Sequence, residues 1–308
     1  MAMSIPADAQ DDKWIGKTLL GDYAIQELLG KGAMARVYKA HQGSTGKYLA
    51  LKTLISKEPE LIARFAKEVE MHGKLKHRNI VETFGCINDA STGQAFFVME
   101  FLNGKTLQEI VKEKGPAASS EAIYAVTSQL CDALSYAHNM GIIHRDLKPA
   151  NIVVVDTEKI ELKVVDFGIA KARNETVALT MPGTVVGSPI YMSPEQCRGM
   201  ELDPRADVYS LGCLLYELVT GNVPYFSKNV MQVMNSHCRP EVHPKPIIAF
   251  SPKVQRPMHL NQILKTALET EREKRFQSVA ELKAAVETWH NAIKLGHDDN
   301  AEMVMPKN

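Results

Sequence analysis

The spacing of the apolar residues changes near Gly104, and this change constrains the fold more than any other feature of the sequence. Between about residues 23 and 55, short apolar runs are separated by glycine-containing turns, which is typical of antiparallel strands. Beyond Gly104, Ser119 and Ser120 can cap a long amphipathic helix that Gly141 ends, and helical segments dominate from about residue 205 onward. The pattern predicts an α+β fold with a small sheet-rich half, a larger helical half and a cleft between them.

One main helix is expected inside the sheet-rich half, because Leu61, Phe65 and Val69 recur at helical spacing. The sequence contains no internal repeat and no low-complexity segment, and both ends read as loose tails. We therefore predict one two-lobed domain at 21–294. Its parts are an N-terminal tail at 1–20, an N-lobe at about 21–102, a C-lobe at about 103–294 and a C-terminal tail at 295–308.

The charge balance argues against a nucleic-acid partner, because 36 Lys and Arg residues match 36 Asp and Glu residues. The five cysteines are scattered, and none lies in a CxxC spacing. Free thiols in a reducing compartment, the cytoplasm, are therefore expected. No apolar stretch is both long and uncharged enough to span a bilayer. We expect no membrane segment in this chain, and a membrane anchor outside the chain is the alternative left open.

The segment 30–37, GKGAMARV, places two glycines between expected strands. Glycine lets the backbone approach a phosphate closely, although the same residues also suit an ordinary hairpin turn. A dinucleotide fold would need a helix next, but residues 36–40 read as a strand. In the following strand, Lys52 has apolar neighbours, and Glu68 lies sixteen residues later on the expected helix. Each alone could be a solvated charge, whereas together they could aim an ammonium group at a phosphate.

The most informative segment is HRDLKPAN at 144–151, followed by DFG at 166–168. From one tight loop, Asp146 and Asn151 can face a single phosphate site. The Asp146 carboxylate would orient or accept a hydroxyl proton. The Asn151 amide and Asp166 would supply the oxygen ligands that Mg²⁺ prefers. This order, behind a glycine loop and a strand lysine, predicts phosphoryl transfer.

Taken together, these motifs resemble the eukaryotic-type Ser/Thr protein kinase family, most closely its bacterial members, over about residues 20–292. The resemblance implies a two-lobed fold: a small antiparallel-sheet N-lobe with one main helix, and a larger helical C-lobe. It also implies a transferase that moves the γ-phosphate of Mg·ATP to Ser/Thr hydroxyls of protein substrates. The implied cofactors are ATP and Mg²⁺, with Mn²⁺ as an alternative metal.

The resemblance assigns a role to each site residue. Asp146 is implied as the catalytic base and Lys148 as a γ-phosphate contact, while Lys52 contacts the α/β-phosphates. Glu68 pairs with Lys52, and Asn151 and Asp166 hold the metal. Met99 resembles the gatekeeper residue. The implied ATP-binding set is Leu29, Gly30, Lys31, Gly32, Ala33, Val37, Ala50, Lys52, Met99, Glu100, Leu102 and Val153, in which the backbones of Glu100 and Leu102 bond adenine and Val37, Ala50 and Val153 sandwich its ring.

Three further residues have implied structural roles. Ser193-Pro194-Glu195 resembles the signature that closes the activation segment, and Glu195 is expected to pair with Arg275. Asp207 resembles the buried aspartate that anchors the catalytic loop, here residues 144–151. The sequence departs from the family at His72, where relatives place an apolar side chain. Either His72 is an ordinary buried histidine or it is a pH-sensitive packing element.

The resemblance also implies control by autophosphorylation of the activation segment, residues 166–195. Thr180 is the favoured site, with Thr184 and Thr176 as alternatives. A phosphate there would pair with Arg145 and Lys171, which otherwise leave positive charge under the segment. Phosphorylation in trans would involve a homodimer as a partner.

Two other classes of protein share parts of this pattern. A pseudokinase scaffold would have lost Lys52, Asp146 or Asp166, and none is lost. A phosphotransferase acting on small molecules would lack both the Lys148-Pro149 pair and an activation segment ending in Ser-Pro-Glu. Tyrosine kinases usually lack that lysine as well, so Ser/Thr specificity is expected.

Overall fold

The computed structural model describes residues 12–32, 35–55, 58–89, 93–117, 119–167, 189–247 and 254–296; at positions 59–61, 64, 67 and 68 it describes the backbone alone. The chain divides into two compact units. Unit 1 comprises Met1–His77 and Val81–Asn103, and unit 2 comprises Arg78–Ile80 and Gly104–Asn308. Among the described residues, none of the helices has the length and apolar character needed to cross a bilayer.

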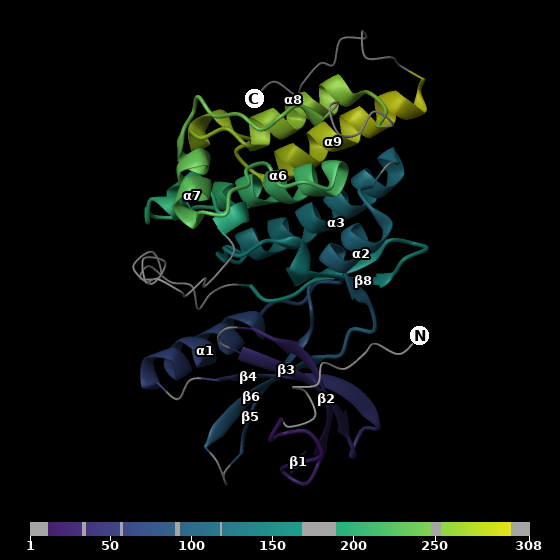
Figure 1. Cartoon of the computed structure of the whole chain (residues 1–308). Coiled ribbons are helices and arrows are strands. Elements are labelled where there is room, and N and C mark those ends of the chain that lie inside the picture. Colours follow the sequence, from purple (N-terminus) through teal and green to yellow (C-terminus); the bar gives the residue numbers. More distant parts are fainter. Residues whose placement is uncertain are drawn as a thin grey trace. The chain divides into compact units, whose positions relative to one another are not determined.

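Unit 1 contains a six-stranded antiparallel sheet in the order β1-β2-β3-β4-β6-β5 (Figure 1). Strands β1 to β4 pair in sequence order, as the glycine-containing breaks predict, whereas β4 pairs next with β6 and β6 with β5. Gly46, with φ of +67°, closes the turn between β3 and β4. The strands are β1 (Thr18–Leu19), β2 (Tyr23–Lys31), β3 (Ala35–Gln42), β4 (Lys47–Leu54), β5 (Thr83–Asp89) and β6 (Gln94–Glu100).

One face of this sheet carries an apolar core that extends into the segment before β1. Trp14 is buried in this core, with its ring edge-to-face against Phe96 at 4.9 Å. Leu19 is buried in the same core, and Asp12 accepts hydrogen bonds from the backbone of Trp14 and from the Tyr38 hydroxyl. Folded structure therefore includes residues 12–20, ahead of the domain start that the sequence pattern indicated. A single tryptophan in a polar stretch gives no periodicity that a sequence pattern could detect.

The opposite face of the sheet packs against helix α1 (Pro59–His72). Phe65 and Val69 of α1 are buried against Phe97 of β6. Pro59 at the first helical position has no N–H to leave unsatisfied, and it fixes a backbone angle suited to a helix start. This is the main helix that the apolar spacing predicted for the first half.

Unit 2 is mainly helical, with a small sheet in the order β7-β8-β9 (Figure 1). Short 3-10 turns lie at Pro149–Asn151, Pro189–Tyr191 and Arg272–Lys274. The sheet and helices are β7 (Lys105–Thr106), α2 (Leu107–Lys114), α3 (Ser120–Asn139), β8 (Ile152–Asp156), β9 (Glu161–Val164), α5 (Pro194–Cys197), α6 (Arg205–Thr220), α7 (Val230–Cys238), α8 (Pro257–Ala267) and α9 (Val279–Lys294).

Helix α6 lies at the centre of unit 2, and nearly all of its residues are buried. It packs on α3 and α8, and Gly212 provides room for this contact, because an added Cβ would lie 3.0 Å from that of Ala267. Helix α3 begins as predicted, with the Ser119 hydroxyl accepting a hydrogen bond from Ala122 N. The central helix thus offers a rigid support on which loops can be anchored.

The segment Arg78–Ile80 belongs to unit 2 rather than to unit 1. Asn79 Nδ2 donates to Leu162 O at 2.8 Å, and Ile80 forms a parallel bridge with Val164 of β9. These three residues lie within the range 21–102 expected for the N-lobe, yet they group with unit 2. Nothing in their composition distinguishes them from the flanking loop.

Candidate active site

Four of the predicted nucleotide-binding residues share one face of the unit 1 sheet. The strand register pairs Val37 of β3 with Lys52 of β4, and Lys52 with Phe97 of β6. Two residues earlier on β4, Ala50 is paired with Met99. Directly paired residues of antiparallel strands point to the same face. Val37, Ala50, Lys52 and Met99 thus form one surface, on the side of the sheet that α1 covers.

His72 lies in the packing between α1 and this face. Its side chain is buried, and its ring stands edge-to-face to Phe97 at 5.9 Å. This contact belongs to the aromatic packing that also joins Phe65 to Phe97. The position of His72 in unit 1 is that of a packing residue.

The glycine-rich segment forms the hairpin between β2 and β3. Gly30 is paired with Val37 and Lys31 with Arg36, and Gly32 N donates to Ala35 O at 2.9 Å. A strand follows the turn, so the segment lacks the helix that a dinucleotide fold requires.

At the end of β6, the backbone N–H of Glu100 is engaged in a hydrogen bond. Its N–H donates to Glu82 O at 2.9 Å, while its carboxylate accepts from Glu82 N at 2.7 Å. An adenine contact at Glu100 would therefore use the carbonyl oxygen. Leu102 is half-buried just beyond the strand, and Leu29 is exposed on β2.

In unit 2, the loop 144–151 brings three predicted residues into direct contact. Lys148 Nζ lies 2.8 Å from Asp146 Oδ2, and Asn151 Nδ2 donates to Asp146 O at 2.9 Å. The same amide nitrogen lies 3.3 Å from Asp146 Oδ2. The carboxylate of Asp146 remains 18% exposed, so it is held in place while still accessible.

Asp207, in the first turn of α6, anchors the start of this loop. Its buried carboxylate accepts hydrogen bonds from the backbone N–H groups of His144 at 2.8 Å and Arg145 at 3.1 Å. It also lies 2.7 Å from Nε2 of His138 on α3. Arg145 has a φ of +65°, which a non-glycine residue adopts only where surrounding contacts hold it. The predicted anchoring contacts of Asp207 are therefore present.

The pKa values of two buried groups around this anchor follow from their surroundings. Burial alone would raise the pKa of Asp207, but the hydrogen bond and charge of His138, with the backbone amide of His144, hold it below its usual value. Burial lowers the pKa of His144. The anchor therefore favours an ionised carboxylate beside a neutral His144 ring.

The two predicted metal ligands are brought together by the pairing of β8 with β9. Ile152 is paired with Val164, and Val165 N donates to Asn151 O at 2.9 Å. Asp166 follows directly, in a left-handed conformation with φ of +57°. Because Asn151 Nδ2 is committed to Asp146, the amide oxygen is the atom left for a cation. An amide oxygen beside a carboxylate suits Mg²⁺.

The end of the activation segment is attached to the same loop. Ser193 and Gln196 form a capping box at the start of α5. Gln196 Nε2 also donates to Arg145 O at 2.7 Å. Sequence reasoning missed Gln196 and His138, because each acts through a contact with a residue distant in the sequence.

Glu195 and Arg275 form the ion pair expected from the sequence. The two guanidinium nitrogens lie 2.7 and 2.8 Å from the carboxylate oxygens, and both side chains are buried. The remaining Arg275 donors bond the carbonyls of Glu269, Arg205 and Thr270. Every guanidinium donor is satisfied, as a buried charge requires.

Several predicted residues lie outside the described part of the chain. The side chain of Glu68 is among them, so its pairing with Lys52 stays a prediction. The other predicted residues outside the described part are Ala33, Lys171, Thr176, Thr180 and Thr184. Val153, by contrast, is described on β8, where it is half-buried.

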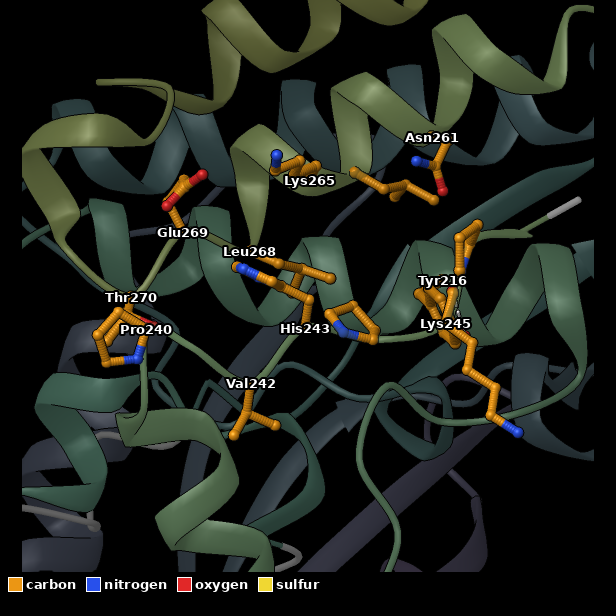
Figure 2. Close-up of a pocket in the computed structure, with 13 residues that line it drawn as sticks. Tyr216, Pro240, Val242, His243, Lys245, Asn261, Lys265, Leu268, Glu269 and Thr270 are labelled. Atoms are coloured by element: carbon orange, nitrogen blue, oxygen red, sulfur yellow. Dashed lines mark hydrogen bonds between the residues drawn. The ribbon is translucent and has the colours of Figure 1, made fainter. Parts of the chain in front are cut away.

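A pocket in unit 2 lies apart from the catalytic loop (Figure 2). It has a volume of about 240 Å³ and lies between Tyr216 of α6, the segment 240–246, Lys265 of α8 and Leu268 just after that helix. Tyr216 donates from its hydroxyl to Lys245 O. None of the predicted site residues lines this pocket. It therefore does not belong to the candidate active site.

Comparison with known proteins supports the interpretation of these motifs. The protein kinase domain family matches residues 23–287. The serine/threonine-protein kinase pkn3 of Myxococcus xanthus is 38% identical over 258 residues, covering 80% of this chain and 47% of that protein. The serine/threonine-protein kinase PknB of Mycobacterium tuberculosis is 36% identical over 281 residues, covering 87% of this chain and 43% of that protein. This chain spans less than half the length of these two relatives.

Among solved structures, that of Rad53 1–466 in complex with AMP-PNP matches with a TM-score of 0.69 and 29% identity. The match covers 85% of this chain and 64% of the Rad53 chain. The chain belongs to the protein kinase domain family, and the predicted α+β fold of that family is confirmed.

Proposed function

We propose that this domain is a serine/threonine protein kinase that transfers the γ-phosphate of ATP to Ser or Thr hydroxyls of proteins. One observation carries the proposal: Asp146, Lys148 and Asn151 contact one another on a loop that Asp207 anchors. The relatives named above are serine/threonine-protein kinases. Because this chain covers less than half of each, the activity of the whole protein is part of the proposal.

In this reaction, the substrate hydroxyl oxygen forms a bond to the γ-phosphorus as the bond from that phosphorus to the β,γ-bridging oxygen breaks. The hydroxyl proton passes to the Asp146 carboxylate. The Lys148 ammonium, paired with Asp146, reduces the negative charge of the transferred group. Asn151 holds the base through its amide nitrogen. Positioning and charge neutralisation therefore account for most of the catalysis.

The residues on the β3-β4-β6 face have the role of nucleotide contacts. Lys52 would contact the α/β-phosphates with Glu68 as its partner, and Met99 would act as the gatekeeper. Val37 and Ala50 offer apolar contacts to adenine, as does Val153 of unit 2. The other members of the proposed set are Leu29, Gly30, Lys31, Gly32, Ala33, Glu100 and Leu102.

Asn151 and Asp166 would hold Mg²⁺, or Mn²⁺ in its place. The metal supplies positive charge to the phosphates of ATP. The chemistry of the donor set supports this assignment, since both groups offer hard oxygen atoms and neither offers sulfur or imidazole. Removal of divalent cations by excess EDTA is therefore expected to abolish transfer.

The direct test is a phosphotransfer assay with radiolabelled ATP in three arms: the protein alone, the protein with a generic protein substrate, and the protein with small hydroxyl compounds. We expect label on protein, as phosphoserine or phosphothreonine after acid hydrolysis. Label on small compounds alone would support the small-molecule phosphotransferase. A lack of label with bound ATP would support the pseudokinase.

For control, we propose autophosphorylation of the activation segment at Thr180, with Thr184 and Thr176 as alternatives. A phosphate there would pair with Arg145 and Lys171 and order the segment. One copy in a homodimer would phosphorylate the activation segment of the other. Phosphosite mapping by mass spectrometry before and after ATP incubation tests this proposal, which fails if no phosphate lies between Asp166 and Glu195.

We also propose a cytoplasmic location for the catalytic domain. All five cysteines are free, as expected in a reducing compartment. The equal numbers of acidic and basic residues favour protein substrates over nucleic acid. Fractionation of cells that express the native protein, with detection of this domain, tests the location.

A further inference from the structure

Two cysteines of unit 2 meet where α5 and α7 end. Cys197 is the last residue of α5, and Cys238 is the last residue of α7. Cys238 Sγ lies 3.8 Å from Pro194 O, at the start of α5. Arg198, which follows Cys197, donates to Cys238 O at 2.6 Å. The two helices are thus fastened together at these thiols.

The two thiols differ in exposure. Cys197 is buried, whereas Cys238 is half-buried and in reach of solvent. The Cys238 thiol donates to Pro194 O, and its interaction with the Cys197 thiol shifts the pKa of both groups, which sets them apart from a lone cysteine. Cys131 and Cys213 are buried, and Cys86 is exposed on β5 of unit 1.

The surroundings also separate the thiols in acidity. The hydrogen bond from Cys197 and the positive charge of Arg198 lower the pKa of Cys238 to about 7. The hydrogen bond with Cys238 and burial raise the pKa of Cys197. The lowered pKa raises the fraction of Cys238 that is thiolate at neutral pH, and the thiolate is the form that reacts as a nucleophile.

The position of Cys197 links this pair to the proposed catalytic loop. The residue before it, Gln196, donates to the carbonyl of Arg145, next to Asp146. A shift of Cys197 would move this tether. A disulfide needs sulfurs about 2.05 Å apart, closer than two hydrogen-bonded thiols, so forming one must draw α5 and α7 together.

We propose that Cys197 and Cys238 form a redox-sensitive pair that peroxide converts to a disulfide, and that the disulfide lowers phosphotransfer. The Cys238 thiolate attacks an oxygen of hydrogen peroxide, the O–O bond breaks, and the leaving hydroxide is protonated to water. Cys238 is then a sulfenic acid. The Cys197 sulfur attacks the Cys238 sulfur, and the displaced hydroxide takes the Cys197 proton and leaves as a second water. Two thiols are oxidised and one peroxide is reduced.

The reverse reaction requires a reducing thiol, which attacks the disulfide and restores both cysteines. Cytosolic disulfides are usually of this transient kind. The disulfide itself depends only on the geometry of α5 and α7, whereas its effect on transfer rests on the kinase function proposed above. The test therefore measures disulfide formation and its effect on phosphotransfer in separate experiments.

The first measurement is peptide mapping of the reduced protein after treatment with one equivalent of hydrogen peroxide. We expect a peptide pair joined at Cys197 and Cys238, and a loss of about 2 Da in the intact mass, equal to two hydrogens. Cys238→Ser should abolish the joined pair, while Cys86→Ser, the matched exposed control, should leave it. Since the wild-type protein supplies the main readout, the result does not depend on whether a variant folds.

The second measurement is phosphotransfer before oxidation, after oxidation and after reduction with dithiothreitol. Because displacements of about 1 Å near a catalytic group can cost about 100-fold, we expect oxidation to lower kcat by roughly tenfold. Reduction should restore it, and Cys238→Ser should lose the peroxide response. If oxidation by peroxide stops at the sulfenic or sulfinic acid of Cys238, the proposed disulfide is wrong. A mapped disulfide with unchanged kcat overturns the regulatory effect alone.

Discussion

The catalytic loop in unit 2 and the β4 face in unit 1 position their residues in different ways. The loop is held by side chains distant in the sequence: Asp207 bonds two of its amides, and Gln196 bonds one of its carbonyls. On β4, by contrast, Ala50 and Lys52 are positioned by the pairing of backbones with β3 and β6.

This difference teaches which substitutions report on chemistry and which report on structure. A side chain on β4 can be replaced while the strand hydrogen bonds stay in place. A side chain that anchors the loop supports both the fold and the function, so its replacement affects both. The predictions below test that separation.

The largest effect is expected for Lys52→Met. Loss of the ammonium should lower kcat/KM for phosphotransfer by about 100-fold or more, because the charge that positions the phosphates is removed. The thermal unfolding midpoint should stay near that of the wild type, since β4 keeps its pairing. Lys47→Met, at the exposed start of the same strand, is the matched control and should retain activity. A stable Lys52→Met variant with normal turnover would remove this residue from the site.

Asp207→Asn should affect both stability and activity. The buried carboxylate accepts from two backbone amides and lies against His138, so losing its charge should reduce the free energy of unfolding by about 3 kcal/mol. Asp203→Asn, in a partly exposed ion pair just before α6, is the control and should cost less than about 1 kcal/mol. Urea unfolding measures both. Equal effects of the two substitutions would contradict the anchoring role.

A smaller effect is expected from pH, through His144 of the catalytic loop. Burial lowers the pKa of His144 from 6.5, so the folded protein binds fewer protons there than the unfolded chain does below that pH. The contribution of neutral His144 to stability is complete above pH 6.5 and is lost as the pH falls toward the folded pKa. One such group changes the free energy of unfolding by at most about 1.4 kcal/mol per pH unit.

His144→Gln removes this titration, so its stability should fall less than that of the wild type between about pH 7 and about pH 5.5. His243→Gln replaces an exposed histidine and serves as the control. Urea midpoints at both pH values supply the comparison. An unchanged pH slope in His144→Gln would show that this ring does not titrate as its burial implies.

The sequence predicted those parts of the molecule that rest on local pattern. Apolar spacing found the sheet-rich half, the helix α1 and the cap of α3, because each follows from periodicity or from one capping residue. The motif at 144–151 predicted residues that do contact one another. Asp146 and Asn151 are only five positions apart in the sequence, so one tight loop brings them together.

The sequence missed features that depend on contacts between distant segments. Trp14 packs on Phe96, and His138 meets Asp207, although no spacing connects either pair. The contact of Cys238 with Pro194 O, at the start of the helix that Cys197 ends, is of the same kind. Residues drawn together only by the packing of elements that are distant in the sequence leave no periodic signal.

The most direct test of the central claim is the phosphotransfer rate of Asp146→Asn. Asparagine keeps the shape of the side chain but cannot accept the hydroxyl proton as a carboxylate does, so we predict a fall in kcat of about 100-fold or more with a protein substrate. The fold should persist, because the Asp146 side chain is partly exposed and the anchor at Asp207 is untouched. Asp156→Asn, at the last residue of β8, is the control and should keep normal activity. Near-normal turnover by a folded Asp146→Asn protein would contradict the account.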